Sequence, residues 1–242
     1  MRSSYPLLIH QVRISMRSLR LIQAFLKNTS ERTQNNIFGF IEDGRQDPNK
    51  FFFMFERISI HDRSVLRKAC SALEMGGVIA YPTDTIYGLG CDALNDQAIQ
   101  KLNSIKQREG PLSVLCSDIE TGLSWMDLPY HQKTNAKEKL GRATTIIVPI
   151  KDNIVSRLIM GEGNSLGIRI PDHNFCINLA NKYSNPITTT SVNRTGYNPH
   201  TNPNEIQIEF SDEIELCIDD GIIEGRGSAI YKFKNGNWEV LR

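Results

Sequence analysis

Long apolar runs are missing from this sequence of 242 residues. A membrane-spanning helix needs roughly 18 consecutive apolar residues, and no stretch approaches that length. With 40% hydrophobic and 23% charged residues, the composition is typical of a globular chain and excludes a disordered one. A chain of this length is one large domain or one ordinary domain with an extension, and it buries roughly 70% of its unfolded surface on folding.

Cysteine is scarce, and its pattern excludes two kinds of site. The five cysteines are widely spaced, odd in number and without a C-x-x-C pair. A disulfide framework or a cysteine zinc site is therefore not expected, and reduced thiols in a cytosol-like compartment are. The five histidines also lack ligand spacing, so no metal held by protein side chains is predicted.

Several common catalytic and nucleotide-binding motifs are absent as well. The sequence contains no G-x-x-x-x-G-K-[ST] phosphate loop, no G-x-G-x-x-G and no H-E-x-x-H. The run 163–167 (GNSLG) matches G-x-S-x-G, but it precedes a predicted strand, whereas the nucleophile elbow follows a strand and opens a helix, so this run is interpreted as a turn. The absent motifs argue against P-loop and dinucleotide-binding proteins and against metalloproteases. No covalent nucleophile is predicted.

Charge of one sign is concentrated only near the start. The whole chain carries 28 basic and 27 acidic residues, but residues 1–53 carry 8 and 4 while residues 54–242 carry 20 and 23. Residues 1–30 are rich in Arg and Ser and contain no acid, a composition typical of an organelle transit peptide. A poorly ordered extension or an upstream start before Met54 are the alternatives, so we divide the chain into an extension (1–53) and a main domain (54–242).

Hydrophobic periodicity predicts alternating helices and strands in the main domain. Helices are expected from a candidate N-cap at Asp62 to Gly76, over 95–107 and over 173–183. Strands are expected at 78–81, 112–116, 144–150, 166–170, 187–190, 214–218, 227–232 and 237–241. This order predicts an α/β domain with a mixed sheet.

Polar loops follow two of the predicted strands. Thr83, Asp84 and Thr85 come after the strand 78–81, where α/β folds place ligands, although these side chains could instead stabilise a turn by bonding their own backbone. Ser191 and Asn193 end the strand at 187–190 and offer donors and acceptors for a phosphate, a ribose or a small polar substrate. Their threonine-rich run is also simply good strand material.

Three cations stand out. Lys106 and Arg108 end the predicted helix 95–107 and could grip an anion together, or could only complement the helix dipole. Arg169 lies inside an apolar strand, where a buried charge needs a partner. That partner could be an anionic ligand or a structural carboxylate.

Taken together, four motifs resemble one family. These are the run from Tyr81 to Gly90 (YPTDTIYGLG), Lys106-x-Arg108, the run 167–172 (GIRIPD) and Ser191-x-Asn193. Their order and spacing are similar to the YrdC family of threonylcarbamoyl-AMP synthases, from about residue 60 to the C-terminus. The resemblance implies an α/β, YrdC-like twisted mixed sheet with flanking helices and a concave basic cavity.

The resemblance also implies a nucleotidyltransferase activity in tRNA modification. Such an enzyme makes threonylcarbamoyl-AMP and pyrophosphate from L-threonine, bicarbonate and ATP with Mg²⁺, and a downstream tRNA threonylcarbamoyl transferase complex uses the product. By motif match, the expected ATP contacts are Lys106, Arg108, Thr144, Ser191, Asn193 and Arg242. The expected threonine contacts are Thr85, Tyr87, Arg169 and Ser228. The expected compartment is the cytoplasm, or an organelle if residues 1–53 are a transit peptide.

The sequence departs from the family pattern in two places. The loop after Arg108 is about two residues short, and Arg142 stands where proline is usual. The end at Arg242 resembles the short, single-domain members. The alternatives are a YciO-like paralogue, a non-catalytic double-stranded RNA-binding module, and the acyl-transfer module of hydrogenase-maturation carbamoyltransferases, whose zinc-finger cysteines are missing here.

Overall fold

The computed structural model describes residues 55–141 and 143–242, so the predictions made for residues 1–53 and for Arg142 lie outside the described residues. The strands are β1 (Glu56–Ser59), β2 (Ile79–Tyr81), β3 (Gly88–Gly90), β4 (Ser113–Leu115), β5 (Thr144–Pro149), β6 (Ser165–Arg169), β7 (Ile187–Ser191), β8 (Leu216–Asp219), β9 (Ala229–Lys234) and β10 (Asn237–Val240). The helices are α3 (Val65–Glu74), α4 (Asp96–Lys106), α5 (Ile119–Trp125), α6 (Tyr130–Lys139), the 3₁₀ turn η1 (Arg157–Ile159), α7 (Asn174–Lys182) and α8 (Pro203–Phe210).

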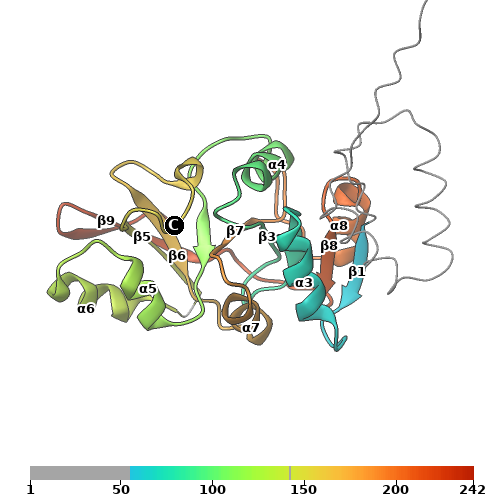
Figure 1. Cartoon of the computed structure of the whole chain (residues 1–242), viewed down its shortest axis with the longest axis horizontal. Helices are drawn as coiled ribbons and strands as arrows, with labels where there is room; N and C mark the ends of the chain where they lie inside the picture. Colours follow the sequence, from blue (N-terminus) through green and yellow to red (C-terminus); the bar gives the residue numbers. More distant parts are fainter. Residues whose placement is uncertain (1–54, 142) are drawn as a thin grey trace, which may run out of the picture. The chain divides into compact units, whose positions relative to one another are not determined.

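The strands join into one sheet in the order β1-β8-β2-β3-β7-β4-β6-β5-β9-β10. The pairs β1–β8, β2–β8, β4–β6 and β5–β9 are parallel, and the other neighbours are antiparallel. Figure 1 shows α5 and α6 near the β5 and β9 end of the sheet, whereas α3 and α8 lie near the β1 and β8 end. The predicted mixed α/β sheet is therefore confirmed.

Local sequence explains the helix ends that matter for the site. The Asn95 side chain accepts hydrogen bonds from the backbone of Gln97 and Ala98, and α4 ends at Gln107, which adopts a left-handed conformation (φ 54°). The helix predicted over 95–107 is confirmed. The predicted N-cap of α3 is wrong, because the Asp62 carboxylate bonds the backbone N–H of Ser64 and forms a turn ahead of the helix.

Helices cover both faces of the sheet. Helices α4, α6 and α8 bury side chains such as Leu102, Ala136 and Phe210 against Ile146 and Ile168 on one face. Helices α3 and α7 bury another set against the opposite face, including Leu73, Leu179, Tyr81, Leu115 and Leu216. No described helix is long and apolar enough to cross a membrane.

Strand register brings the predicted site residues onto the α3/α7 face. Directly paired residues in neighbouring strands point to the same face of a sheet. Leu115 pairs with Arg169, and Arg169 pairs with Thr145. Tyr81 pairs with Gly88, which pairs with Ser191. Since Leu115 and Tyr81 pack under α3 and α7, the side chains of Arg169, Thr145 and Ser191 belong to that same face.

Candidate functional site

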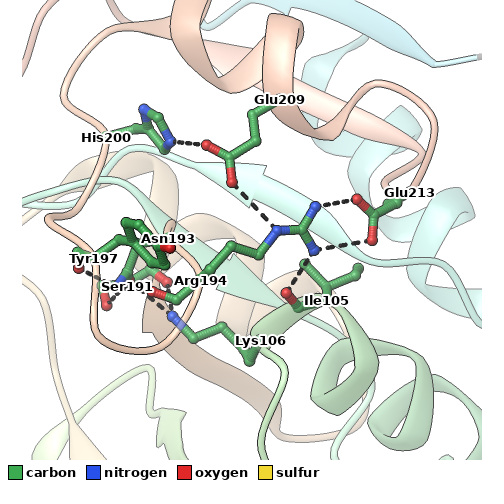
Figure 2. Close-up of polar contacts among 9 residues, drawn as sticks. All are labelled: Ile105, Lys106, Ser191, Asn193, Arg194, Tyr197, His200, Glu209 and Glu213. Carbon is green, nitrogen blue, oxygen red and sulfur yellow. Dashed lines mark hydrogen bonds and ion pairs between the residues drawn. The ribbon is translucent and has the colours of Figure 1, made fainter.

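The structure joins Lys106, Ser191 and Asn193 into one group, called the Lys106 cluster below (Figure 2). The Lys106 ammonium donates to the backbone oxygen of Ser191 at 2.7 Å and to Oδ1 of Asn193 at 2.8 Å. The Ser191 hydroxyl donates to the same Asn193 oxygen. These three residues come from the end of α4 and from the end of β7, 85 residues further along the chain. Three of the expected ATP contacts are therefore in direct contact with one another.

The electrostatics of the Lys106 cluster favour an added anion. Lys106 is 3% exposed, and its two acceptors are neutral oxygens. Burial, followed by the nearby charges of Arg108 and Arg194, lowers the pKa of Lys106 to about 8. Because an ammonium has three donors, these contacts with described residues leave one donor for a ligand. A phosphate there would satisfy both the unused donor and the uncompensated charge.

Arg169 forms a second group with Asp84 and Thr85, called the Arg169 cluster below. Its Nη2 donates to Oδ1 of Asp84 at 2.6 Å and to the Thr85 hydroxyl at 2.7 Å. The structural carboxylate that the sequence left open is thus present as Asp84. Arg169 is 6% exposed, yet its Nε has no hydrogen-bond acceptor within residues 55–141 and 143–242. A buried, unsatisfied donor is rare, and here it lies beside the predicted threonine contacts.

The loop between β2 and β3 carries the Arg169 cluster across the sheet. Strands β7 and β4 stand between β3 and β6, so Asp84 and Thr85 reach Arg169 over the face of those two strands. The Thr83 hydroxyl accepts from the backbone of Thr85 at 3.1 Å and donates to the oxygen of Ile86 at 2.6 Å. The loop is therefore both a self-bonded turn, as one alternative stated, and a support for polar groups.

Residues 220–228, called the covering segment below, lie against this loop. The Tyr87 hydroxyl donates to the oxygen of Gly221 at 2.7 Å and accepts from the N–H of Asp220 at 3.0 Å. A Cβ added at Gly225 would stand 1.7 Å from the Thr85 oxygen, so only glycine allows this approach. Burial raises the pKa of Tyr87 well above its usual value, which keeps its hydroxyl neutral.

The predicted residues in and around β5 and β9 divide between the two faces of the sheet. Ser228 and Thr145 share a hydrogen bond of 2.8 Å between their hydroxyls, and Arg242 Nε donates to the oxygen of Ser228 at 2.9 Å. Since Thr145 pairs with Arg169, this group adjoins the Arg169 cluster. Thr144 precedes Thr145 in the strand, and alternation directs its side chain to the other face, where it lines a cavity of about 170 Å³ with Lys139 and Tyr231. Thr145, which no motif indicated, joins this group through its hydroxyl, and the ATP contact expected for Thr144 stays a prediction.

Small residues connect the two clusters. Ser113 of β4 pairs with Gly167 of β6 and with Thr189 of β7, so all three lie on the face of Arg169 and Ser191. A Cβ at Gly167 would stand 2.2 Å from the Ser113 hydroxyl oxygen, which shows how closely this face is packed. The only signal in the sequence for this connection was Gly167, at the start of the GIRIPD run.

The predicted basic cavity stays a prediction. A shallow depression of about 550 Å³ is lined by Thr201, Glu224, Gly225 and Arg226, and it therefore adjoins the covering segment. Arg108 is exposed beside the Lys106 cluster.

Within the residues that the structure describes, no group of three or more His, Cys, Asp or Glu side chains could hold a metal ion.

Comparisons with known proteins find relatives of this chain by sequence and by structure. A threonylcarbamoyl-AMP synthase from Photobacterium profundum is 33% identical over 159 residues, which cover 64% of this chain and 85% of that protein. P. abyssi Sua5, solved in complex with L-threonine, superimposes with a TM-score of 0.69 at 25% identity. The match covers 78% of this chain and 56% of Sua5, so this chain spans little more than half the length of that relative.

A further solved structure has the same fold. E. coli YciO matches with a TM-score of 0.72 at 22% identity over 78% of this chain and 95% of that one, which supports the fold alone. The family model Sua5_yciO_yrdC, described as telomere recombination, matches residues 71–242. That range is well over half of the chain and contains both clusters. The chain belongs to the Sua5/YciO/YrdC family.

Proposed function

We propose that this protein is an L-threonylcarbamoyladenylate synthase, a nucleotidyltransferase that makes threonylcarbamoyl-AMP and pyrophosphate from L-threonine, bicarbonate and ATP. The observation that carries the proposal is the pair of buried cations, Lys106 and Arg169, which stand beside two different sets of polar groups. Membership of the family and the relative named as a synthase support the same reaction.

The two clusters suit the two main substrates. The Lys106 cluster offers a cation with neutral partners and hydroxyl and amide groups, which fits the phosphates of ATP. The Arg169 cluster offers a cation and a carboxylate side by side, which matches the carboxylate and the amine of an amino acid. Arg108, Thr144 and Arg242 are proposed as further ATP contacts, and Thr85, Tyr87 and Ser228 as further threonine contacts.

The proposed chemistry needs positioning more than a protein nucleophile. Bicarbonate carboxylates the threonine nitrogen with loss of water, and an oxygen of the resulting carbamate attacks the α-phosphorus of ATP. The new P–O bond replaces the bond to the β-phosphate, and pyrophosphate leaves with that electron pair. Lys106 would hold phosphate oxygens while Arg169 holds the threonine carboxylate, so that the reacting atoms meet in line.

Several elements of this proposal come from family resemblance. Mg²⁺ would enter with ATP, held by phosphate oxygens, and would neutralise charge on the triphosphate. The product would pass to a tRNA threonylcarbamoyl transferase complex. The proposed compartment is the cytoplasm, or an organelle if residues 1–53 are a transit peptide.

The direct test is pyrophosphate release by the purified full chain with ATP, Mg²⁺ and bicarbonate, with and without L-threonine. We expect release that requires threonine, with L-serine and L-valine as weaker or inactive controls. Identification of threonylcarbamoyl-AMP by mass spectrometry would establish the product.

A folded protein that releases no pyrophosphate would contradict the synthase proposal. ATP binding without turnover would then favour a YciO-like paralogue, a reading that the shortened loop after Arg108 keeps open. Binding of double-stranded RNA without ATP binding would favour the RNA-binding module, although residues 54–242 carry 20 basic and 23 acidic side chains.

A further inference from the structure

Arg194 directly follows Asn193, yet its side chain points away from the Lys106 cluster toward α4 and α8 (Figure 2). Nη1 donates to the Ile105 oxygen at 2.7 Å and to Oε2 of Glu213 at 3.0 Å, and Nη2 donates to Oε1 of Glu213. Nε donates to Oε1 of Glu209 at 3.2 Å. Every nitrogen of the guanidinium group is therefore engaged, which fixes its orientation.

The bond to Ile105 matters because Ile105 immediately precedes Lys106. Its carbonyl belongs to the last turn of α4, where carbonyls lack partners inside the helix. The next residue of the loop, Thr195, donates its N–H to the carbonyl of Lys106 at 3.0 Å. Two consecutive loop residues thus hold two consecutive carbonyls at the end of α4, and they fix the backbone from which the Lys106 side chain begins.

The Lys106 side chain contacts the same loop, so the end of α4 and the loop are joined through both backbone and side-chain hydrogen bonds. Its ammonium contacts Ser191 and Asn193, and the Asn193 amide donates to the oxygens of Arg194 at 2.8 Å and Tyr197 at 2.6 Å. Without the Arg194 side chain, the Ile105 carbonyl would lose its partner, and the helix end would be joined to the loop only by the Thr195 N–H and by the Lys106 ammonium.

Arg194 also controls the charges around Lys106. The neighbouring cations are Arg108, after α4, and Arg194 itself, and both contribute to the lowered pKa of Lys106. The neighbouring carboxylates are Glu209 on α8 and Glu213 after it; both pair with Arg194, and Glu209 also bonds Nε2 of His200. Removing Arg194 would delete a positive charge and leave two carboxylates without their cation, so the pKa of Lys106 should rise.

We propose that Arg194 is a positioning residue, which never touches substrate but holds Lys106 and Asn193 in the geometry that binds the ATP phosphates. The proposal rests on the proposed function in taking ATP as the ligand. It adds a residue outside the family-derived set, and it assigns to the ion pairs of Arg194 a role in binding.

Two substitutions separate the contributions of Arg194. Arg194→Gln removes the charge, and Arg194→Lys keeps the charge but loses the fork that joins Glu213 and Ile105. Arg67→Gln on α3 is the matched control, because Arg67 is exposed and lies on the helix that packs under the other end of the sheet. ATP and threonine affinities would be measured by isothermal titration calorimetry. The titration of Lys106 would be followed by pH-dependent acetylation with acetic anhydride and peptide mass spectrometry.

We expect Arg194→Gln to weaken ATP binding about tenfold, comparable to losing one charge-assisted hydrogen bond, with threonine affinity within about twofold. The titration midpoint of Lys106 should rise in Arg194→Gln and stay low in Arg194→Lys, although Arg194→Lys should still bind ATP more weakly than the unmodified protein. Arg67→Gln should match the unmodified protein in all three readouts.

ATP affinity within twofold of the unmodified protein in folded Arg194→Gln would overturn the proposal. So would an unchanged Lys106 midpoint, or equal losses for both ligands with only a lower melting temperature, since these results indicate a purely structural role. If the unmodified protein binds ATP but releases no pyrophosphate, the synthase proposal fails while these readouts still decide the role of Arg194. If it binds no ATP, both proposals fail.

Discussion

The Lys106 and Arg169 clusters solve the same physical problem, a buried cation, in opposite ways. Lys106 is surrounded by neutral oxygens and by two further cations, and its pKa is lowered to about 8. Arg169 is paired with the buried carboxylate of Asp84. The Lys106 cluster therefore carries an uncompensated positive charge. The Arg169 cluster is close to neutral and instead presents hydrogen-bonding groups in a fixed orientation.

This difference teaches what each site can bind. An uncompensated cation gains most from a polyanion, which removes the cost of burying its charge. A neutral pair gains most from a ligand that carries both signs, because such a ligand can bond each partner without leaving a net charge. Under the proposed function, the partners of the two cations would separate triphosphate binding from amino-acid binding.

The comparison is tested most severely by Lys106→Ala. Loss of this buried lysine should weaken ATP binding about 100-fold, the value of roughly two charge-assisted contacts. Threonine affinity should change less than about threefold, because the Arg169 cluster keeps its own partners. Calorimetry with each ligand measures both, and a comparable loss of threonine binding would contradict the separation.

Arg169→Lys tests the other cluster. A lysine retains the charge but loses the fork that serves Asp84, Thr85 and a carboxylate together, so the KM for threonine should rise about 30-fold. The KM for ATP should change little. An unchanged KM for threonine would indicate that Arg169 forms only a structural ion pair with Asp84.

Raising the pH should weaken ATP binding without loosening the fold. Only protonated Lys106 attracts phosphate, so ATP affinity should fall about tenfold between pH 7 and pH 9, through the pKa of about 8. The unfolded state keeps its proton up to the ordinary value of 10.5, and so stability linked to Lys106 rises with pH across this window. A Lys106→Arg variant should lose the pH dependence, and an unaltered dependence in that variant would contradict this cause.

Gly225→Ala tests the contact between the covering segment and the Arg169 cluster. The new Cβ would meet the Thr85 oxygen at 1.7 Å and force the segment away. We expect about fivefold weaker threonine binding and a loss of roughly 2 kcal/mol in the free energy of unfolding, measured with urea. Gly236→Ala in the β9–β10 turn is the control, because nothing lies within 4 Å of its added Cβ, although its φ of +83° adds a strain of its own.

Arg108→Ala should have the smallest effect. Arg108 is exposed, and water screens its attraction for phosphate, so ATP affinity should fall only about threefold. Its removal should also raise the midpoint of Lys106, since Arg108 is one of the two cations that lower that pKa. A loss of ATP affinity as large as that of Lys106→Ala would contradict this prediction, because it would show that Arg108 contributes as much to ATP binding as Lys106 does.

Elements with strong local signals were predictable from the sequence. The apolar stripe of α4 indicated that helix, and β-branched runs indicated β5 and β7. The strand β3 (Gly88–Gly90) was missed because its glycines have low strand propensity, and its place depends on pairing with β2 and β7. Helix α6 was missed because only Ala136 is buried, so no apolar stripe marks it.

The candidate site was predictable as a set of motifs but not as a geometry. The motifs named Lys106, Asn193 and Arg169, but which of them contact each other depends on register across the sheet. Asp84 as the partner of Arg169 and Arg194 as the link to α4 both join residues at least 85 apart in the sequence. No local pattern signals such pairs.

The most direct measurement is a paired calorimetric titration of ATP and L-threonine into the unmodified protein, Lys106→Ala and Arg169→Lys. We predict a crossed result, in which Lys106→Ala loses ATP binding and keeps threonine binding, while Arg169→Lys does the reverse. Parallel losses of both ligands in either variant, with the fold intact by circular dichroism, would contradict the claim that the two buried cations serve two different substrates.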